Sequence, residues 1–324
     1  MGLFGAWAKS GQKRWYRGNE GFPSFCRTGN LFLLDGYTKA RRSGMMNNER
    51  TIALIGAGSM AEALIAGMTK AFCHPAHIVV ANRRNRPRLE ELARQYGVGT
   101  ADCAQEAVKQ ADIIILAMKP KDVAEAMNAI APSIRSDHLI LSLLAGVTTE
   151  TIERLAGRNI PVVRAMPNTS AAVGLSATAI AGGRFAAKEH LEIAKQLFET
   201  VGIVAVVPER DLHAVTGLSG SGPAYVYYLV EAMEKAAADI GLERDVAKRL
   251  ILQTIIGAAE MLKASDKHPS VLRREVTSPG GTTEAGIGVL EQYRFQEAVI
   301  ACIRRATARS EELGSALLAA IAEA

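Results

Sequence analysis

The sequence predicts an α/β fold of the Rossmann type, with a doubly wound parallel sheet in its first half, followed by an all-α domain. Two observations predict this fold. In residues 51–207, short and nearly continuous apolar runs alternate with segments of helical period, a pattern typical of parallel strands covered by helices on both faces of the sheet. From Leu212 onward no such alternation returns, and the apolar residues recur at helical spacing.

The first unit is a strand, a turn and a helix, in residues 51–71 (TIALIGAGSMAEALIAGMTKA). Gly56 permits a tight turn, Gly58 lets the backbone approach a pyrophosphate, and the small Ala61 lets the helix pack closely on the strand. The N–H groups that begin the helix would then face the phosphates. We therefore expect a dinucleotide to contact Ile55, Gly56, Ala57, Gly58, Ser59, Met60 and Ala61.

The end of the next strand, HIVVAN (77–82), bears on the choice of cofactor. An acidic residue here would bind the ribose hydroxyls of NAD, but the chain continues Asn82-Arg83-Arg84. Arginine forks suit a 2′-phosphate, so we expect NADPH, with NADH as a weaker alternative. A merely solvated basic loop would instead give equal affinity for the two cofactors.

Further strands are expected within 111–120, 137–146 and 159–168, with helices at 121–131 and 148–156, and two apolar strands at 176–182 and 202–207 complete the sheet. Ligands of such sheets gather at the carboxyl ends of the strands. Cofactor contacts are accordingly expected at Ala117, Met118, Lys119, Pro120 and Asn168. Lys119 is either a phosphate or substrate contact or a solvated loop charge.

The second half predicts two long helices in residues 223–265, opening with Pro223 and broken at Gly241. Residues 249–262 are apolar on more than one side. A helix of this kind buries its faces against another subunit as well as its own, so we expect an obligate homodimer or a larger assembly.

Two polar loops interrupt these helices, LSGSGPAY (218–225) and VTSPGGTTEAG (276–286). Serine, glycine and threonine at a helix start are commonly just caps. The second loop, however, also makes a cradle of backbone N–H groups flanked by hydroxyls at a helix N-terminus, which suits a carboxylate. Both interpretations stay open from these residues alone.

With these loops, the chain resembles the pyrroline-5-carboxylate reductase family from about residue 50 to 318, most specifically at LSGSGPAY and at LRREVTSPGGTTEAGIGVLE (272–291). IGAGSMAEAL, AMKP and AMPNTS match the family's cofactor-contacting segments. Ser170 replaces a common proline and Met118 a valine, while residues 1–45 have no counterpart.

The resemblance implies a NADP-binding Rossmann domain at 46–210 and an all-helical dimerisation and substrate domain at 211–324. It implies reduction of the C=N bond of 1-pyrroline-5-carboxylate to L-proline, the last step of proline biosynthesis, by homodimers that in many members assemble as decamers. By the same resemblance Ser278 and Thr283 are the catalytic residues. The substrate carboxylate would lie against Ser278, Gly281, Thr282 and Thr283, with the Thr283 hydroxyl near the ring nitrogen.

A protonated imine is electrophilic enough to accept hydride without a strong protein acid, so the lack of an evident catalytic histidine, cysteine or metal site agrees with this reaction. CHPAH (73–77) is interpreted as a polar turn rather than a metal site. A reductase of the β-hydroxyacid dehydrogenase type is the first alternative, but it would need a catalytic lysine, and 211–238 offers only Lys235. The second is a non-enzymatic NADPH-binding protein.

Composition limits the partners and the compartment. Residues 1–45 carry eight of the basic residues and two of the acids, which leaves 30 basic and 31 acidic residues in the remainder, so the net charge of +5 indicates no nucleic-acid surface on the folded part. That extension is expected to be disordered or a wrongly assigned start, with a transit peptide or a nucleic-acid arm as alternatives. No apolar run is long enough to span a membrane, and the four cysteines lack paired spacing, so a cytoplasmic enzyme is expected.

Overall fold

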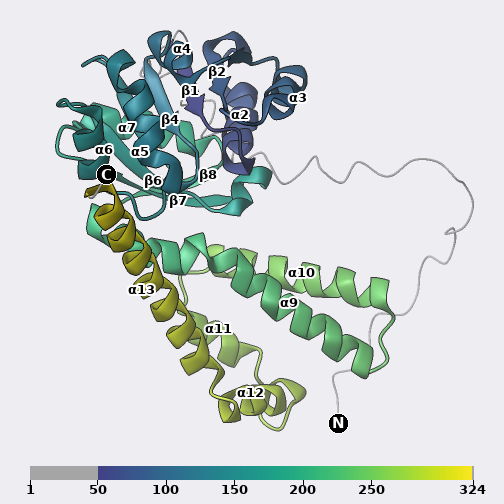
Figure 1. The fold of residues 1–324 in the computed structure, drawn as a ribbon. Helices are drawn as coiled ribbons and strands as arrows, with labels where there is room; N and C mark the ends of the chain where they lie inside the picture. The colour runs from purple at the N-terminus through teal and green to yellow at the C-terminus, as the bar shows by residue number, and fades with distance from the viewer. Residues whose placement is uncertain (1–49, 323–324) are drawn as a thin grey trace, which may run out of the picture. The chain divides into compact units, whose positions relative to one another are not determined.

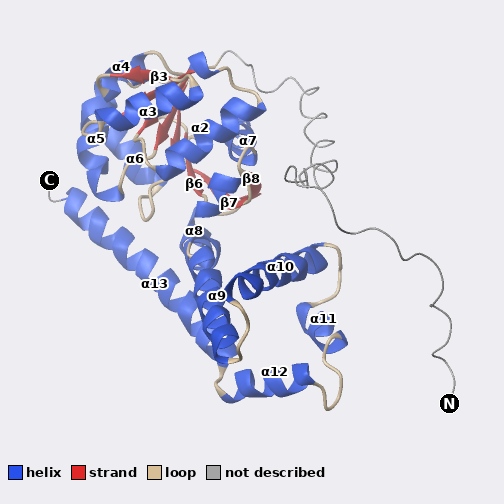
Figure 2. Ribbon diagram, turned by 90° about the vertical axis from the view of Figure 1, so that its right-hand side faces the viewer, coloured by secondary structure: helices blue, strands red, loops and turns tan. Residues whose placement is uncertain are grey.

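The computed structural model of the chain describes residues 50–322 (Figure 1). The extension at 1–45, with its predicted disorder or wrong start, lies outside the described residues. Within them, an eight-stranded sheet with its covering helices is followed from α8 (Leu212–Val215) by helices alone (Figure 2). None of the helices in this part of the chain is long and apolar enough to cross a membrane.

The sheet has the strand order β3-β2-β1-β4-β5-β6-β7-β8. Because β1 lies between β2 and β4, the strand order reverses there, and the carboxyl ends of β1 and β4 form the switch point where such sheets bind ligands. The strands are β1 (Ile52–Ile55), β2 (Ile78–Ala81), β3 (Gly99–Ala101), β4 (Ile113–Leu116), β5 (Leu139–Ser142), β6 (Val162–Met166), β7 (Ser176–Gly182) and β8 (Gly202–Val206).

One pairing departs from the predicted parallel sheet. From β3 to β6 every pair is parallel, but β7 runs antiparallel to β6, with Met166 opposite Ala179, and β8 is parallel to β7. The reason is the short connection between β6 and β7, which contains only the 3₁₀ turn Thr169–Val173. A parallel pair needs a crossover of a dozen or more residues, usually a helix, whereas a short connection returns the chain antiparallel.

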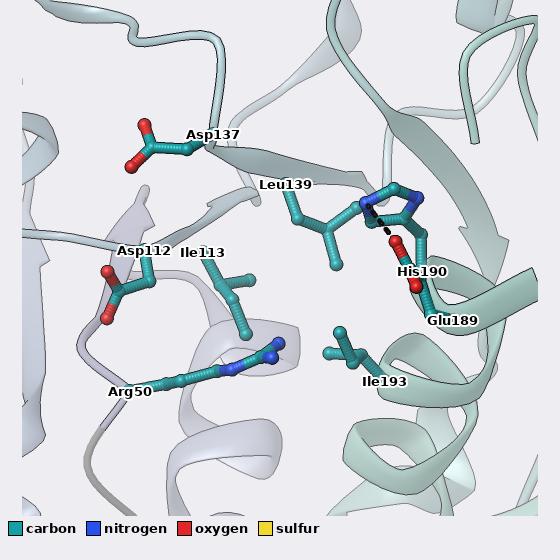
Figure 3. A pocket seen from close by; sticks show the side chains of 8 residues that line it. All are labelled: Arg50, Asp112, Ile113, Asp137, Leu139, Glu189, His190 and Ile193. Carbon is teal, nitrogen blue, oxygen red and sulfur yellow. Dashed lines mark ion pairs between the residues drawn. The ribbon is translucent and has the colours of Figure 1, made fainter. Parts of the chain in front are cut away.

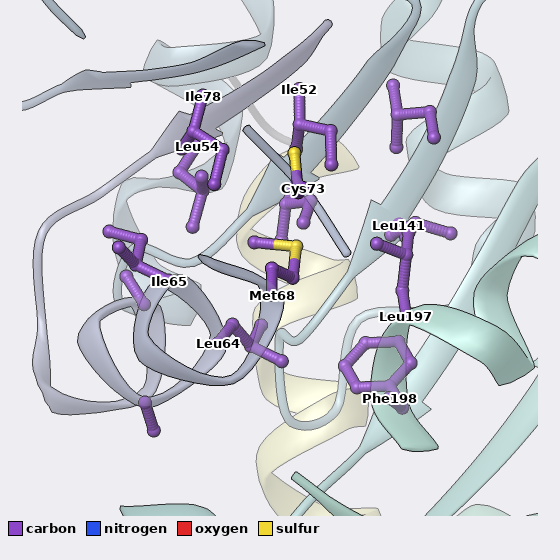
Figure 4. Close-up of a cluster of buried hydrophobic side chains, with 14 of the residues drawn as sticks. Ile52, Leu54, Leu64, Ile65, Met68, Cys73, Ile78, Leu141, Leu197 and Phe198 are labelled. Atoms are coloured by element: carbon purple, nitrogen blue, oxygen red, sulfur yellow. The ribbon is translucent and has the colours of Figure 1, made fainter. Parts of the chain in front are cut away.

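Helices cover both faces of the sheet, and the alternation of side chains along each strand divides the core in two. On one face, Ile52 and Leu54 of β1 pack with α2 and α7 (Figure 4). On the other face, Ala53 and Ile55 pack with α4, α5 and α6. The helices are α2 (Ser59–Ala71), α3 (Arg86–Tyr96), α4 (Ala104–Lys109), α5 (Val123–Ile130), α6 (Thr149–Ala156) and α7 (Lys188–Glu199).

The helical part confirms the break at Gly241, which has a φ of 81° and separates α9 (Gly222–Asp239) from α10 (Arg244–Lys263). It continues with α11 (Pro269–Glu275), α12 (Thr282–Gln292) and α13 (Phe295–Ala322). The far end of α13 returns to the sheet, where Leu317 and Ile321 pack against the second core cluster. Between α9 and α10 lies a small core of Ala237, Ala247 and Ile251, whereas α11 and α12 bury no residue in this chain.

Candidate functional site

The glycine-rich turn joins β1 to α2 at the switch point of the sheet. The Gly56 N–H donates to the Ala81 carbonyl of β2 at 2.9 Å, and its φ of 117° favours glycine. A Cβ at Gly56 would lie 2.6 Å from the carbonyl carbon and oxygen of Ala117. Gly56 is thus required both by its backbone angle and by the close approach of the segment that follows β4.

Gly58 lies at the start of α2 and leaves space in front of the helix. It is the N-cap residue, and a Cβ built on it would meet nothing within 4 Å. The first N–H that bonds within the helix is that of Glu62, to the Gly58 carbonyl at 3.0 Å, so the N–H groups of residues 59–61 point out of the helix start. This arrangement fits the pyrophosphate of a dinucleotide, whose negative charge suits a helix N-terminus. Ala61 is fully buried beneath it.

The loop after β2 is held in shape by Asn82. Its side-chain Oδ1 accepts hydrogen bonds from the N–H groups of Arg84 and Asn85, both at 3.0 Å. The Arg83 guanidinium forms an ion pair with Glu125 of α5, with both side chains at least half exposed, while Arg84 is exposed. Asn82 therefore shapes the loop, and the two arginines offer the positive charge that the sequence led us to expect.

Lys119 and Asn168 differ in how they are held. Lys119 is exposed and precedes the 3₁₀ turn Pro120–Asp122, with its carbonyl accepting from the Asp122 N–H at 3.0 Å. Asn168, at the carboxyl end of β6, is buried: its Nδ2 donates to the Ser219 carbonyl at 3.1 Å and its Oδ1 accepts from the Ser170 N–H at 3.2 Å. Asn168 thus links the carboxyl end of β6 to the LSGSGPAY segment, a role that its sequence motif alone did not reveal.

The predicted LSGSGPAY loop is not a loop in the structure, because a π-helical turn at Thr216–Gly220 and the single bend residue Ser221 join α8 to α9. Gly217 lies against α13, because a Cβ there would be 2.3 Å from the Thr307 Oγ1. The Tyr225 hydroxyl donates to the Gly217 carbonyl at 3.1 Å and holds the turn. Such turns inside α-helices frequently lie at functional sites, and the repeated Gly and Ser residues were the only signal in the sequence.

The VTSPGGTTEAG loop connects α11 to α12. Thr277 fastens its first part to α11 by donating from its N–H to the Arg274 carbonyl at 3.0 Å and from its hydroxyl to the Arg273 carbonyl at 2.6 Å. Gly280 has a φ of 71°, and its N–H donates to the Glu284 Oε2 at 2.7 Å. The Gly281 N–H donates to the Ser278 carbonyl at 2.9 Å. Gly281 is then the N-cap residue of α12 and makes no side-chain cap.

The remaining polar groups of this loop point out of the helix start. The Ala285 N–H is the first to bond within α12, to the Gly281 carbonyl at 3.2 Å, so those of Thr282 and Thr283 lie before the helical ladder. Ser278, Thr282 and Thr283 are exposed, and within residues 50–322 no hydrogen bond uses their hydroxyls. Since they do not cap α12 in this chain, the arrangement favours a carboxylate site over simple helix caps.

Large apolar side chains are exposed along the helices from α9 to α13. Tyr228 of α9 is 75% exposed and Met261 of α10 is 60% exposed. Others with at least two-fifths of their surface exposed are Val226, Tyr227, Leu229, Leu250, Leu252, Ile256, Leu262, Val289, Leu290, Phe295 and Ile300. An apolar surface of this extent is typical of a subunit interface.

A pocket at the amino ends of the strands contains neither the glycine-rich turn nor the loop before α12 (Figure 3). There Asp112 precedes β4 and Asp137 precedes β5, with His190 and Ile193 of α7 on the other side of the pocket. Because ligands of this fold bind at the carboxyl ends, and because the lining is acidic, we do not assign the cofactor to it.

The relatives of this chain share nearly its whole described length. Pyrroline-5-carboxylate reductase 2 of Bacillus subtilis is 50% identical over 265 residues, which cover 82% of this chain and 95% of the relative. The chain belongs to the pyrroline-5-carboxylate reductase family. The reductase of Methanosarcina acetivorans is 39% identical over 269 residues, covering 83% of this chain and 99% of the relative.

The family models and solved structures agree with this membership. Residues 209–313 match the model of pyrroline-5-carboxylate reductase dimerisation, and residues 51–146 match that of coenzyme F420-dependent NADP oxidoreductases. The pyrroline-5-carboxylate reductase of Coxiella burnetii has a TM-score of 0.75 at 35% identity, covering 82% of this chain and 98% of its own. That of Plasmodium falciparum, solved with NADP bound, has a TM-score of 0.76 at 27% identity, with 83% of this chain and 100% of its own covered.

These comparisons confirm the family, the fold class and the reductase function expected from the sequence, and they confirm a nicotinamide cofactor. The dimerisation model also supports self-association of this reductase. The roles of the individual cofactor-binding, substrate-binding and catalytic residues stay predictions.

Proposed function

We propose that this pyrroline-5-carboxylate reductase reduces the C=N bond of 1-pyrroline-5-carboxylate to give L-proline, the last step of proline biosynthesis, and that it uses NADPH in preference to NADH. The observation that carries the proposal is the loop before α12, whose exposed hydroxyls and outward N–H groups form a small anion site in a helical region. A dinucleotide site alone would serve many reductases. The second loop selects a substrate with a carboxylate.

The cofactor half of the site fits a phosphorylated dinucleotide. Open space at Gly58 receives the pyrophosphate in front of α2, and Arg83 and Arg84 supply positive charge beside the adenosine ribose. Glu125 pairs with Arg83 in this structure, but a phosphate with nearly two negative charges competes well for an exposed guanidinium. When bound, NADPH supplies the hydride for the imine carbon.

The substrate half orients the ring by its carboxylate. The N–H groups of Thr282 and Thr283 and the Ser278 hydroxyl are free to donate, whereas the Gly281 N–H is already donated to the Ser278 carbonyl. We assign the substrate carboxylate to these three groups, with Gly281 shaping the turn. The Thr283 hydroxyl is then placed to donate to the ring nitrogen as it becomes an amine.

These residues act by orientation rather than by strong acid catalysis. The protonated imine carries its own proton, so the protein has to hold the imine carbon at about 3 to 3.5 Å from the hydride donor and exclude water. Accurate placement of two bound reactants accounts for a large part of the barrier reduction in such a reaction. A neutral threonine hydroxyl is sufficient for the remaining hydrogen bond.

We propose a homodimer as the active unit and, on the resemblance to the family, a decamer of five dimers as its further assembly. The exposed apolar helices support the dimer, since water contact on this scale is unfavourable for an isolated chain. A cytoplasmic location, a NADP domain at 46–210 and a helical dimerisation and substrate domain at 211–324 complete the proposal. No nucleic acid or membrane has a part in it.

The test is oxidation of NADPH by the purified full chain, and by a chain that starts at Met46, with the cyclic imine and with β-keto acids as competing substrates. We expect imine-dependent turnover with both proteins and none with the keto acids. Imine turnover at the background rate, or faster turnover of a β-keto acid, would overturn the proposal.

A further inference from the structure

Behind the glycine-rich turn, Arg88 of α3 contacts two elements of the cofactor site. Its Nε donates to the Ala57 carbonyl at 3.3 Å, in the middle of the turn. Its two terminal nitrogens pair with Glu62 of α2 and, at 2.6 Å, with Glu91 of its own helix. The Tyr96 hydroxyl donates to the other oxygen of Glu62 at 3.2 Å, so this carboxylate is held from two sides.

Glu62 makes this contact important for cofactor binding. It lies in the first turn of α2, the helix start that we assign to the pyrophosphate. A carboxylate in the first turn stabilises a helix by itself, but it repels a phosphate group that approaches the same end. The side chain is only 28% exposed, so solvent screens its charge incompletely. A positive partner is needed to offset that repulsion.

We propose that Arg88 is a positioning residue of the cofactor site, which neutralises Glu62 and holds the Ala57 carbonyl so that the turn keeps its N–H groups toward the pyrophosphate. The inference rests on the proposed function, because it takes the turn at residues 56–61 as the pyrophosphate site. Arg88 itself need not touch the cofactor. Asn85 caps α3 by accepting from the Arg88 N–H at 3.1 Å, and this cap fixes the backbone of Arg88 next to the loop with Arg83 and Arg84.

The proposal predicts a loss of affinity that is the same for both nicotinamide cofactors. We expect Arg88→Ala to raise the dissociation constants of NADPH and NADH about tenfold each, since a charge-assisted network is lost and Glu62 is left unpaired. At saturating cofactor, kcat and the KM for the imine should stay near the wild-type values. Adding Glu62→Gln should restore part of the affinity, because the uncompensated charge is then removed. Fluorescence titration of the folded full chain measures each constant.

Three further variants make the result decisive. Arg94→Ala removes the same charge from an exposed position of the same helix and should leave the affinity unchanged. Arg88→Gln removes the charge but keeps most of the side-chain length, so it should weaken both cofactors as alanine does and serves in its place if Arg88→Ala fails to fold. Gly58→Val fills the open space in front of α2 and should abolish binding if the pyrophosphate lies there.

The outcomes separate this inference from the proposed function. If Gly58→Val weakens NADPH while folded Arg88→Ala or folded Arg88→Gln binds NADPH like the wild type, the cofactor site stands and the role of Arg88 is wrong. If Gly58→Val also binds normally, the proposed cofactor site itself is wrong. A loss confined to NADPH would make Arg88 a 2′-phosphate contact, and no recovery with Glu62→Gln would overturn its neutralising role.

Discussion

Thr283 lies in the first turn of α12, where its hydroxyl is exposed beside the outward N–H groups of the loop. We expect Thr283→Ala to lower kcat by about one to two orders of magnitude, because a hydrogen bond that steadies the developing amine would be lost in the transition state. The KM for NADPH should change little, since the glycine-rich turn is unaffected. Steady-state kinetics with Thr283→Ser as matched control check this, and an unchanged kcat in the alanine variant would exclude the hydroxyl from the reaction.

Arg83 and Arg84 give a prediction about cofactor choice. Replacing both with alanine should weaken NADPH by about tenfold or more while NADH changes only slightly, because only NADPH has a 2′-phosphate for the guanidinium groups to bind. The ratio of kcat/KM for the two cofactors is the measurement. Glu125→Gln is a useful companion, since it releases Arg83 from its ion pair. Equal losses for NADPH and NADH would show that the loop is only a solvated basic segment.

For individual residues, the sequence predicted those whose role follows from their neighbours along the chain. It missed those whose role follows from contacts with distant parts of the chain. Gly56 could be predicted because a strand followed by glycine and a helix has few solutions. Two contacts could not be predicted, that of Ala117 with Gly56 and that of Ser219 with Asn168. The spacing of the motifs along the sequence contains no information about these distances. Arg88 lacked any sequence signal, since its partners Ala57 and Glu62 lie in another element.

Among the elements, the strands with continuous apolar runs were predicted well because both of their faces are buried. The short β3 was missed because its middle residue, Thr100, is exposed and its sequence has no apolar run. The direction of β7 could not be deduced from its own residues, since side chains alternate identically in parallel and antiparallel strands. The length of the connection before it contained that information.

Two glycines make a close approach between α13 and the loop that follows β5. Gly314 of α13 lies against Gly146, and a Cβ on Gly314 would be 2.9 Å from the Gly146 carbonyl oxygen. We expect Gly314→Val to destabilise the folded protein by about 1 to 3 kcal/mol, because a side chain forced into a packed contact moves backbone on both sides. Urea unfolding at fixed protein concentration measures the change. The control is Gly257→Val in α10, where an added Cβ meets no atom of this chain within 4 Å. If both variants lose the same free energy of unfolding, the close packing of Gly314 on Gly146 does not stabilise the fold.

For the whole molecule, the two halves of the site depend on different kinds of structure. The cofactor half is supported by a sheet whose core is fully buried, whereas the loop before α12 lies among helices whose shared core is small and whose outer faces are apolar and exposed. A second copy that covers those faces would remove the apolar surface from water and hold the substrate loop in place. Assembly and substrate binding should therefore be linked, and the loop lies within residues 209–313, which match the dimerisation family model.

Two histidines, buried His138 and partly buried His213, predict how the stability of the whole protein changes with pH. Burial lowers the pKa of His138 below its ordinary 6.5, and nearby Arg135 lowers it further. Burial and then the charge of Arg164 lower the pKa of His213 in the same way. Below about pH 6.5 the unfolded chain therefore binds protons that the folded chain does not. The contribution of these neutral histidines to the free energy of unfolding is fully present above that pH and is lost as the pH falls.

The expected result is a lower urea midpoint at about pH 5.5 than at pH 7.5, measured at one protein concentration because the protein self-associates. Glu153 acts in the opposite sense, since burial raises its pKa above 4.5 and its contribution is lost as the pH rises. His138→Asn isolates the histidine: its amide oxygen can still accept from the Arg135 N–H, which His138 Nδ1 does at 3.1 Å, but it takes up no proton. The decrease in midpoint should be smaller in this variant. An equal decrease would show that buried His138 does not control the acid sensitivity of the fold.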